Sequence, residues 1–414
     1  MQLDAGSARD LDLYDPTTCA TCHPDHYREW SGSMHAYASF DPVFIAMNQR
    51  GQRETNGALG DFCVQCHAPL AVALGKTTDG LNLAELPTKY QGIGCIYCHS
   101  VSGLGTDGHN NDLIVDLNGP LRGAVQEPIP TEAHVTEYST LFDRGHRDSS
   151  ALCGHCHDVR VPSGLLLEQT YLEWQSSLYG QQGTNCAVCH MPGYESPIST
   201  VPDAPVRQLH SHSMAAVDVA LTPFVNERAQ RLAVQAELDP TVSAELCVSL
   251  TSTSVQVEVA LRNRIAGHAF PSGSSQDRRA ILELTAYQGS SLLFTDTSWR
   301  FGREMLDAEG RVVLMFWDAH ATEGDVLPAP LSFDPSDELY EQTFRRRSYR
   351  FIGQPDRVEI RLHLYPVDPL VLEELVSSGD LDPEIITKMP RFTLGNTELL
   401  WSPNSPPCVR SSLR

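Results

Sequence analysis

The sequence lacks any apolar run long enough to span a bilayer, so we expect no membrane-spanning helix in these 414 residues. The first ten residues, Met1–Asp10, are polar and contain no hydrophobic stretch of the kind found in a signal peptide. We therefore expect that any export signal has been removed or omitted from this chain.

Positive charge is also scarce. The chain has 30 Lys and Arg residues against 52 Asp and Glu residues, a formal net charge of −22. Such a surface repels the phosphates of nucleic acids, which excludes that class of partner. It attracts cations or basic partner proteins, although solubility alone explains the charge equally well.

Cysteine is plentiful and its spacing is regular. Ten of the twelve cysteines form five Cys-x-x-Cys pairs, and His follows each pair. The motifs are Cys19/Cys22 with His23, Cys63/Cys66 with His67, Cys95/Cys98 with His99, Cys153/Cys156 with His157, and Cys186/Cys189 with His190. This is the attachment signature of c-type haem: the thiols add to the two vinyl groups, and the His supplies the proximal nitrogen. The sequence therefore predicts five covalently bound c-type haems.

Other uses of paired cysteines explain the pattern less well. Zinc sites do not require a His after every pair. A thioredoxin-like redox pair would account for one motif but not for five. A disulfide within each motif would close a loop too short to stabilise much.

Covalent haem attachment takes place outside the cytoplasm, which predicts a periplasmic or extracellular protein. Two cysteines, Cys247 and Cys408, lie outside the motifs. In an oxidising compartment they could form a disulfide. Two buried free thiols are the alternative.

The pattern along the chain predicts two domains. Residues 1–238 hold every motif and show little regular periodicity, which favours a pentahaem domain that is mostly α-helical or irregular and packed around haem. Short helices are expected at Asp25–Ala38, at about Leu165–Leu178 and on the turns that carry each motif. Another is expected to begin at Thr222-Pro223 and to end at Asp239-Pro240.

Residues 239–414 alternate with a period of two, which predicts an all-β, sandwich-like domain. Its first hairpin is expected to turn at Thr251–Ser254. Further strands are expected at Arg279–Tyr287, Arg311–Trp317, Phe344–Ile352 and Arg357–Tyr365, and helices at Leu370–Val376 and Pro383–Lys388.

A pure electron carrier fills both axial positions of each iron, so the remaining histidines bear on function. The predicted sixth ligands are His35, His134, His146, His212 and His268. His35 follows the first motif, while His134 and His146 precede the fourth. His212 is preferred to His210, and His268 lies on a loop between two strands.

The other histidines are assigned no iron. His26 is too near the first attachment site to face the same iron, and His155 is a spacer inside the fourth motif. His109 lies in a Gly-Asn loop and could be a spare ligand, although a solvated loop is the simpler interpretation. His320 is also expected in a loop, and His363 is expected to be exposed. The basic run Arg345–Arg350 could bind propionates or an acidic partner, but a solvated strand face is the simpler interpretation.

Four segments resemble the multihaem cytochromes related to hydroxylamine oxidoreductase and its tetrahaem electron acceptor, some of which carry a C-terminal β domain. They are CATCHPDHYREWSGSMHAYASFDPVF at 19–44, the second motif region at 61–75, the fourth and fifth at 149–192, and GHAFPSG at 267–273. The resemblance implies respiratory electron transfer, with His35, His134 or His146, His212 and His268 as distal ligands.

The chain departs from these relatives in two ways. Catalytic members typically carry eight haems rather than five, and nitrite-reducing members have a Cys-x-x-Cys-Lys motif that is absent here. Some tetrahaem relatives polymerise into extracellular filaments.

The preferred hypothesis is a non-enzymatic carrier that moves electrons through a chain of bis-His haems to redox partner proteins. No catalytic residue is predicted. The alternatives are a reductase of small nitrogen or sulfur oxyanions with one five-coordinate haem, and a subunit of a homo-oligomer or filament.

Overall fold

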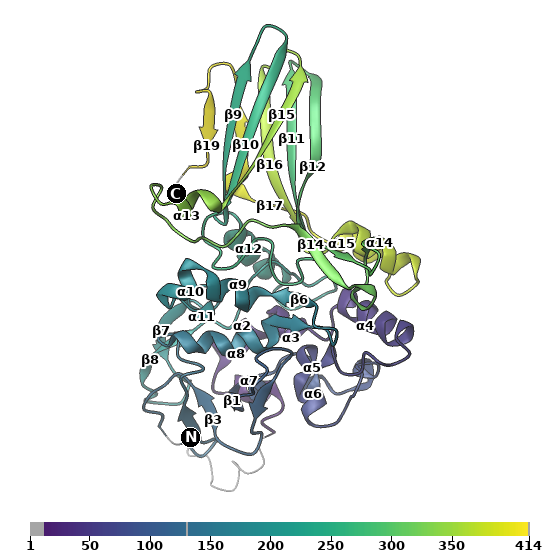
Figure 1. Cartoon of the computed structure of the whole chain (residues 1–414). Helices are drawn as coiled ribbons and strands as arrows, with labels where there is room; N and C mark the ends of the chain where they lie inside the picture. Colours follow the sequence, from purple (N-terminus) through teal and green to yellow (C-terminus); the bar gives the residue numbers. More distant parts are fainter. Residues whose placement is uncertain (1–11, 130, 413–414) are drawn as a thin grey trace. The chain divides into compact units, whose positions relative to one another are not determined.

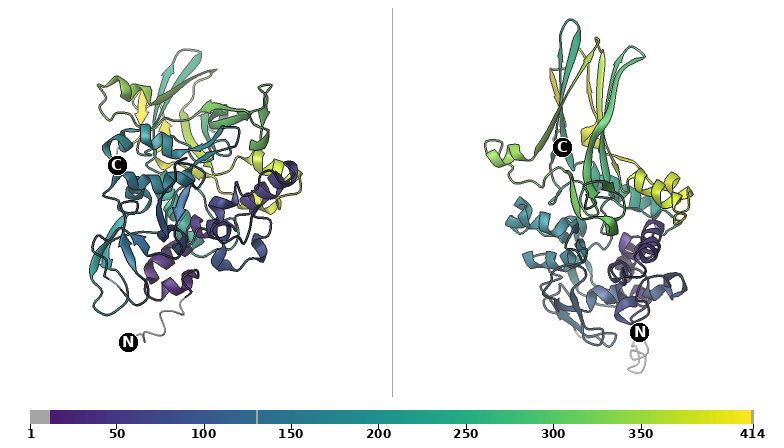
Figure 2. Two further views of the ribbon diagram at one scale, coloured as in Figure 1. Left: turned by 60° about the horizontal axis from the view of Figure 1, so that its bottom comes forward. Right: turned by 45° about the vertical axis from the view of Figure 1, so that its right-hand side comes forward.

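A computed structural model describes residues 12–129 and 131–412. The chain forms two compact units (Figures 1 and 2). The motif unit comprises Met1–Arg160, Gly183–Arg231 and Leu375–Ile385, and the β unit comprises Val161–Gln182, Leu232–Glu374 and Ile386–Arg414. Within the described ranges, no helix combines the length and apolar character needed to cross a membrane.

The motif unit is built from short helices and two-stranded sheets. Proline at the first helical position and an aspartate cap begin several of them; Asp15 accepts from Thr17 N at α1, and Asp41 from Val43 N at α4. The helices are α1 Pro16–Ala20, α2 Pro24–Ser31, α3 Met34–Tyr37, α4 Pro42–Glu54, α5 Val64–His67, α6 Pro69–Ala73, η2 Leu83–Glu85, η3 Thr88–Tyr90, α7 Cys95–His99, η4 Arg147–Ser149, α8 Ser150–His157 and α11 Cys186–His190. The strands are β1 Val101–Leu104, β2 Leu113–Val115, β3 Leu121–Gly123, β4 Thr136–Tyr138, β5 Asp158–Arg160, β7 Gly193–Pro197 and β8 Val206–His210.

Side-chain packing in the motif unit is local. One apolar cluster centres on Val64 and Leu83 and another on Leu70, Ile96 and Tyr97. The helix expected at 25–38 is interrupted: α2 ends at Ser31, and α3 begins after Ser33, whose hydroxyl accepts from Ala36 N as a new cap.

The β unit contains two antiparallel sheets, as the alternating pattern predicts. One has the order β15-β10-β9-β19, and the other β13-β12-β11-β16-β17 with β14 and β18 at its side. The strands are β6 Leu166–Gln169, β9 Val242–Leu250, β10 Ser254–Asn263, β11 Arg279–Gln288, β12 Ser291–Leu306, β13 Val312–Val313, β14 Ala321–Asp325, β15 Phe344–Ile352, β16 Arg357–Tyr365, β17 Phe392–Thr393, β18 Leu399–Trp401 and β19 Cys408–Arg410. The helices are α9 Thr170–Ser176, α10 Leu178–Gln182, η5 Phe316–Asp318, α13 Glu338–Gln342 and η6 Gly395–Thr397, while α12 Glu227–Leu238, α14 Pro369–Ser377 and α15 Glu384–Lys388 extend across the unit boundaries.

The first hairpin turns where the sequence predicts it. Leu250 faces Val255 across the β9–β10 turn, and alternate residues along β9 are buried. The two sheets touch through Phe294 of β12 and Phe351 of β15, whose rings stack with centroids 4.6 Å apart. The apolar faces of both sheets therefore form one core.

Two predictions about the β unit are wrong, and one of its strands was not predicted. The strand expected at 311–317 is reduced to Val312–Val313, followed by the 3₁₀ turn η5, and the long strand β12 was not foreseen. His363 was expected to be exposed but is buried, because β16 lies inside its sheet. Its Nε2 lies 2.9 Å from a Glu283 carboxylate oxygen, and its Nδ1 lies 2.9 Å from the Thr393 hydroxyl.

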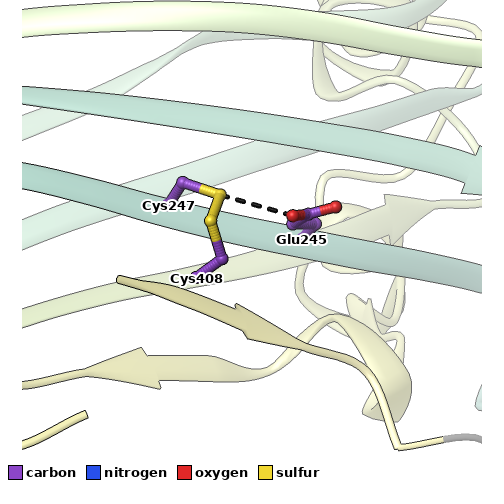
Figure 3. A group of neighbouring side chains, drawn as sticks. All are labelled: Glu245, Cys247 and Cys408. Atoms are coloured by element: carbon purple, nitrogen blue, oxygen red, sulfur yellow. Dashed lines mark hydrogen bonds between the residues drawn. A yellow bond between two sulfur atoms is a disulfide. The ribbon is translucent and has the colours of Figure 1, made fainter. Parts of the chain in front are cut away.

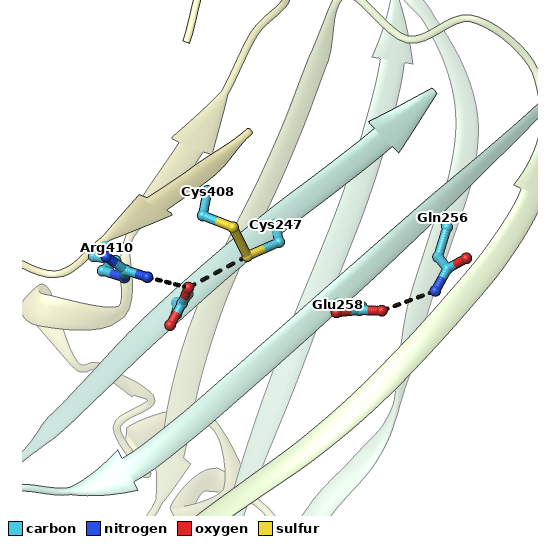
Figure 4. The surroundings of a disulfide bond; sticks show 6 residues. Cys247, Gln256, Glu258, Cys408 and Arg410 are labelled. Carbon is cyan, nitrogen blue, oxygen red and sulfur yellow. Dashed lines mark hydrogen bonds and ion pairs between the residues drawn. A yellow bond between two sulfur atoms is a disulfide. The ribbon is translucent and has the colours of Figure 1, made fainter. Parts of the chain in front are cut away.

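The two remaining cysteines form a disulfide, which settles the alternatives that the sequence left open. Cys247 of β9 and Cys408 of β19 are directly paired across the sheet (Figures 3 and 4). Glu245 lies beside the bond, 3.4 Å from the Cys247 sulfur, and forms an ion pair with Arg410. Since both sulfurs are bonded to each other, this group is not a metal site.

A buried ion pair anchors β11 to the start of α14. Arg279 Nε lies 2.9 Å from an Asp368 carboxylate oxygen, and both side chains are about nine-tenths buried. Replacing Arg279 by methionine leaves the Asp368 carboxylate buried without its charge partner. We expect Arg279→Met to lower the free energy of unfolding by about 3–5 kcal/mol.

Denaturant unfolding followed by circular dichroism would measure that loss. The matched control is Arg346→Met, which removes an exposed ion pair with Glu341 and should cost at most about 1 kcal/mol. Equal losses in the two variants would contradict the prediction.

Candidate haem-binding site

The ten motif cysteines remain free thiols, whereas the other two cysteines are bonded. Four of the five motifs lie on short helical turns, in α5, α7, α8 and α11. On such a turn, residues three and four positions apart lie on one face. Both thiols and the following His of these motifs therefore point to the same side, as covalent attachment of one haem requires.

Four of the motif histidines have the same second contact. In each, Nδ1 lies within hydrogen-bond distance of a backbone carbonyl oxygen: His23 with Ile198 (2.9 Å), His67 with Ala38 (2.9 Å), His99 with Arg122 (2.6 Å) and His190 with Ala215 (2.8 Å). Because a carbonyl only accepts, Nδ1 carries the proton and Nε2 keeps its lone pair. This is the usual arrangement of a metal-binding imidazole.

The first motif differs from the other four at Cys22. A helical turn was expected to carry every motif, but α1 ends at Ala20 and His23 already caps α2, so Cys22 lies in the turn between two helices. The expectation of a helix is therefore wrong at this position, because Pro24 starts a new helix directly after the motif. The backbone N–H groups of Cys22 and His23 still donate to the Cys19 carbonyl, at 3.2 and 2.8 Å. Cys22 thus remains a predicted attachment site, on a turn that these two bonds hold.

The fifth motif differs at Cys189. A unit packed around haem leads one to expect enclosed attachment sulfurs, yet Cys189 is exposed, whereas the other nine motif cysteines are partly buried. The physical reason is its place near the end of α11, where the chain runs along the surface and Pro192 and Gly193 are exposed as well. Cys189 remains a predicted attachment site, because His190 beside it keeps the Nδ1–carbonyl contact of the other motifs.

Three predicted sixth ligands lie opposite motif histidines. The ring centroids are 6.3 Å apart in His23–His134, in His99–His212 and in His35–His157. Two imidazoles that share one metal ion, each at a metal–nitrogen distance of about 2 Å, have centroids roughly 6 Å apart. The spacing of all three pairs therefore fits an iron between the two rings.

Burial keeps these three imidazoles in the form that binds metal. Desolvation, reinforced by neighbouring histidines, lowers the pKa of His35 to about 4 and that of His212 to about 3. The pKa of His134 is lowered by the same cause. All three side chains are thus neutral at physiological pH and have a lone pair to offer.

His26 also lies near a motif histidine, with its ring centroid 6.2 Å from that of His23. The two residues are three positions apart at the start of α2, so they lie on the same side of the helix. They cannot oppose each other across one ring. His26 packs edge-on against His212 instead, with centroids 4.7 Å apart.

The remaining two predicted ligands have different surroundings. His146 is exposed, and its carbonyl accepts from the Ser149 hydroxyl and the Asn185 amide. Of the two predicted ligands that precede the fourth motif, His134 is the one whose ring lies near a motif histidine, His23.

His268 belongs to the β unit, where its loop is held from several sides. Its carbonyl accepts from Asn263 Nδ2 at 2.6 Å, and its Nδ1 lies 2.8 Å from the Ala269 carbonyl oxygen. The Glu173 carboxylate accepts from Ala269 N and from the Ser272 hydroxyl. These bonds fix the backbone on both sides of His268.

Sequence reasoning missed the aromatic side chains beside the motif histidines. Phe44 stacks on His67 with centroids 4.0 Å apart, and Phe142 stacks on His99 at 5.4 Å. Neither position has a motif of its own, so only the fold could bring them to the rings. The basic run on β15 is largely a solvated strand face, in which Arg345 pairs with Asp325 and Arg346 with Glu341.

Comparison with known proteins gives two matches. Residues 18–100, which hold the first three motifs, match the family described as cytochrome c554 and c-prime. The chain also resembles the crystal structure of a penta-haem cytochrome c552 from Thermochromatium tepidum, with a TM-score of 0.65 and 20% sequence identity over 93% of this chain and 97% of the other. No curated protein matches the chain.

At 20% identity the structural likeness establishes the fold, which this chain shares over nearly its whole length with that cytochrome. The predicted β-rich C-terminal region with antiparallel sheets is confirmed. The relation to hydroxylamine oxidoreductase remains a prediction.

Proposed function

We propose that this protein is an exported multihaem c-type cytochrome that carries five covalently bound haems and transfers electrons between redox partner proteins. The three histidine pairs at 6.3 Å carry the proposal, because each joins a motif His to a second, partly buried imidazole. The five motifs agree with the neighbour of the same fold, which is described as penta-haem.

The residues divide the work as follows. The ten motif cysteines would attach the porphyrins, and His23, His67, His99, His157 and His190 would each hold an iron. His134, His212 and His35 would supply a second ligand to the haems of the first, third and fourth motifs, while His146 and His268 remain candidates for the other two. When bound, haem supplies an iron centre that accepts and releases one electron.

Two imidazoles on each iron suit a carrier. They keep the iron low-spin and leave no position for a substrate, so its surroundings change little with redox state. The Nδ1–carbonyl bonds and the burial of His35 and His212 hold the rings in place before any electron arrives.

Thiols of different motifs lie near one another. Cys19 of the first motif and Cys95 of the third are close enough to shift each other's pKa, as are Cys153 of the fourth and Cys186 of the fifth. The haems of each of these two pairs of motifs would therefore be attached at neighbouring positions.

The deciding experiment has two steps. Pyridine haemochrome analysis of the purified holoprotein should give five c-type haems per chain. Carbon monoxide added to the fully reduced protein should then leave the Soret band unchanged, because two protein ligands occupy every iron. A shift equal to about one haem in five would instead expose an open iron and favour the reductase alternative.

A further inference from the structure

Asn111, in the loop between β1 and β2, contacts three haem motifs at once. Its side-chain Nδ2 donates to the Gln65 carbonyl at 2.5 Å, and its Oδ1 accepts from the Tyr97 hydroxyl at 2.9 Å. Its backbone N–H donates to the His155 carbonyl at 2.5 Å. These three partners belong to the second, third and fourth motifs respectively.

The three partners are equivalent positions. Gln65, Tyr97 and His155 each stand directly before the second cysteine of their motif. The contacts of Asn111 therefore converge on the second attachment sulfurs, and the Cys156 sulfur itself lies 3.4 Å from Asn111 Oδ1.

The second cysteines of all three motifs are close to this point. The Tyr97 hydroxyl interacts electrostatically with Cys156, Cys98 and Cys66. Tyr97 is itself only 4% exposed, and the ring belongs to an apolar cluster with Leu70 and Ile96. Tyr97 is therefore the most buried of the partners whose side chains contact Asn111.

The chemistry of asparagine suits this position. A short amide offers a donor and an acceptor on one side chain, as the bonds to Gln65 and Tyr97 require. Its backbone has a φ of +59°, in the left-handed region that asparagine tolerates better than most residues. Aspartate would lose the donor.

The neighbouring Asn110 has a similar backbone but a different role. Its φ is +54°, and its side chain donates to the Arg160 carbonyl and accepts from Arg160 N. Both contacts are with Arg160, which follows the fourth motif. The Asn110 side chain therefore contacts the region of one motif, whereas Asn111 contacts three motifs.

We propose that Asn111 is a positioning residue that fixes the second, third and fourth haem motifs against one another at their second attachment cysteines. The inference rests on the proposed function, because it requires haem at the motifs.

The test compares two glycine variants of the holoprotein, Asn111→Gly and Asn110→Gly. Glycine adopts a positive φ freely, so both variants keep the loop conformation and lose only a side chain. The readout is a redox titration followed by electron paramagnetic resonance, which resolves low-spin haems by their g values. Asn111→Gly should change the g values or midpoint potentials of more than one haem and of at most three, whereas Asn110→Gly should change at most one.

A third variant, Tyr97→Phe, removes only the hydroxyl that bonds Asn111 and keeps the buried ring. It should reproduce part of the change in g values or midpoint potentials expected for Asn111→Gly. If a loop variant fails to fold, this variant still tests the inference. An unchanged spectrum in both Asn111→Gly and Tyr97→Phe would overturn the inference, as would equal changes in the two glycine variants. A wild-type haem count other than five would overturn the proposed function as well, so the two failures are distinguishable.

Discussion

Replacing His35 by alanine should convert one haem in five from low-spin to high-spin. The His35 ring lies near that of His157, with centroids 6.3 Å apart, and its side chain is partly buried, with a pKa lowered to about 4 mainly by desolvation. Alanine has no nitrogen to bind iron, and the remaining five-coordinate ferric iron would be high-spin. Electron paramagnetic resonance of the oxidised protein would show the new signal at the expense of one low-spin haem.

The control for this variant is His26→Ala. His26 also lies among motif imidazoles, and its pKa is likewise lowered to about 4, but it stands on the same side of α2 as His23. All five haems should stay low-spin in that variant. Carbon monoxide should bind one haem of the reduced His35→Ala protein and none of the control.

Added imidazole should restore the low-spin signal of His35→Ala, since it refills the space left by the side chain. Five low-spin haems in His35→Ala without added ligand would show that another group binds that iron. His134→Ala and His212→Ala provide the same test for the haems of the first and third motifs.

Removing the Cys247–Cys408 disulfide should lower the free energy of unfolding by about 2–5 kcal/mol. The bond joins β9 to the C-terminal strand β19 and closes a loop with a sequence separation of 161. A cross-link over so long a loop restricts the unfolded chain strongly, whereas β19 itself has only three residues to hold it in the sheet.

The double variant Cys247→Ser/Cys408→Ser is the appropriate test, because a chemical reductant would also reduce the haems. Its denaturation midpoint should fall while its haem spectrum stays that of the wild type, since neither sulfur belongs to a motif. A midpoint within error of the wild type would mean that β19 is held by its backbone pairing and by the Arg410–Glu245 ion pair alone.

The choice between His134 and His146 illustrates where sequence reasoning ends. Both lie in the segment before the fourth motif, and no sequence motif distinguishes them. The fold brings His134 within 6.3 Å of His23, which is 111 positions earlier in the chain, and leaves His146 exposed. His134 thus faces the first motif rather than the nearby fourth.

The burial of His363 in the β unit is another feature that the local sequence pattern did not predict. The alternation along 357–365 predicted the strand correctly, but it placed the histidine on the solvent side. The structure covers that side with Thr393 of β17 and the Glu283 carboxylate from β11. A buried polar side chain needs hydrogen-bond partners, and these two neighbouring strands supply them for His363.

The attachment cysteines show that a specific motif does not predict the local structure or the exposure of its own residues. The spacing identified Cys22 and Cys189 as well as it identified the other eight. It did not reveal that Cys22 lies between two helices or that Cys189 is exposed. Exposure of a sulfur depends on which segments pack over the motif, and those segments are remote in the sequence.

The sequence by itself determined the features that depend on neighbouring residues. Spacings of a few positions predicted the five Cys-x-x-Cys-His motifs and the change from irregular to two-residue periodicity. They also predicted two strands with the bounds that β15 and β16 have in the structure. Only the tertiary structure decided which histidines oppose each other, which thiols of different motifs meet, and that Cys247 pairs with Cys408. Those contacts join residues tens to more than a hundred positions apart, and no local pattern records a distance that the folded chain alone creates.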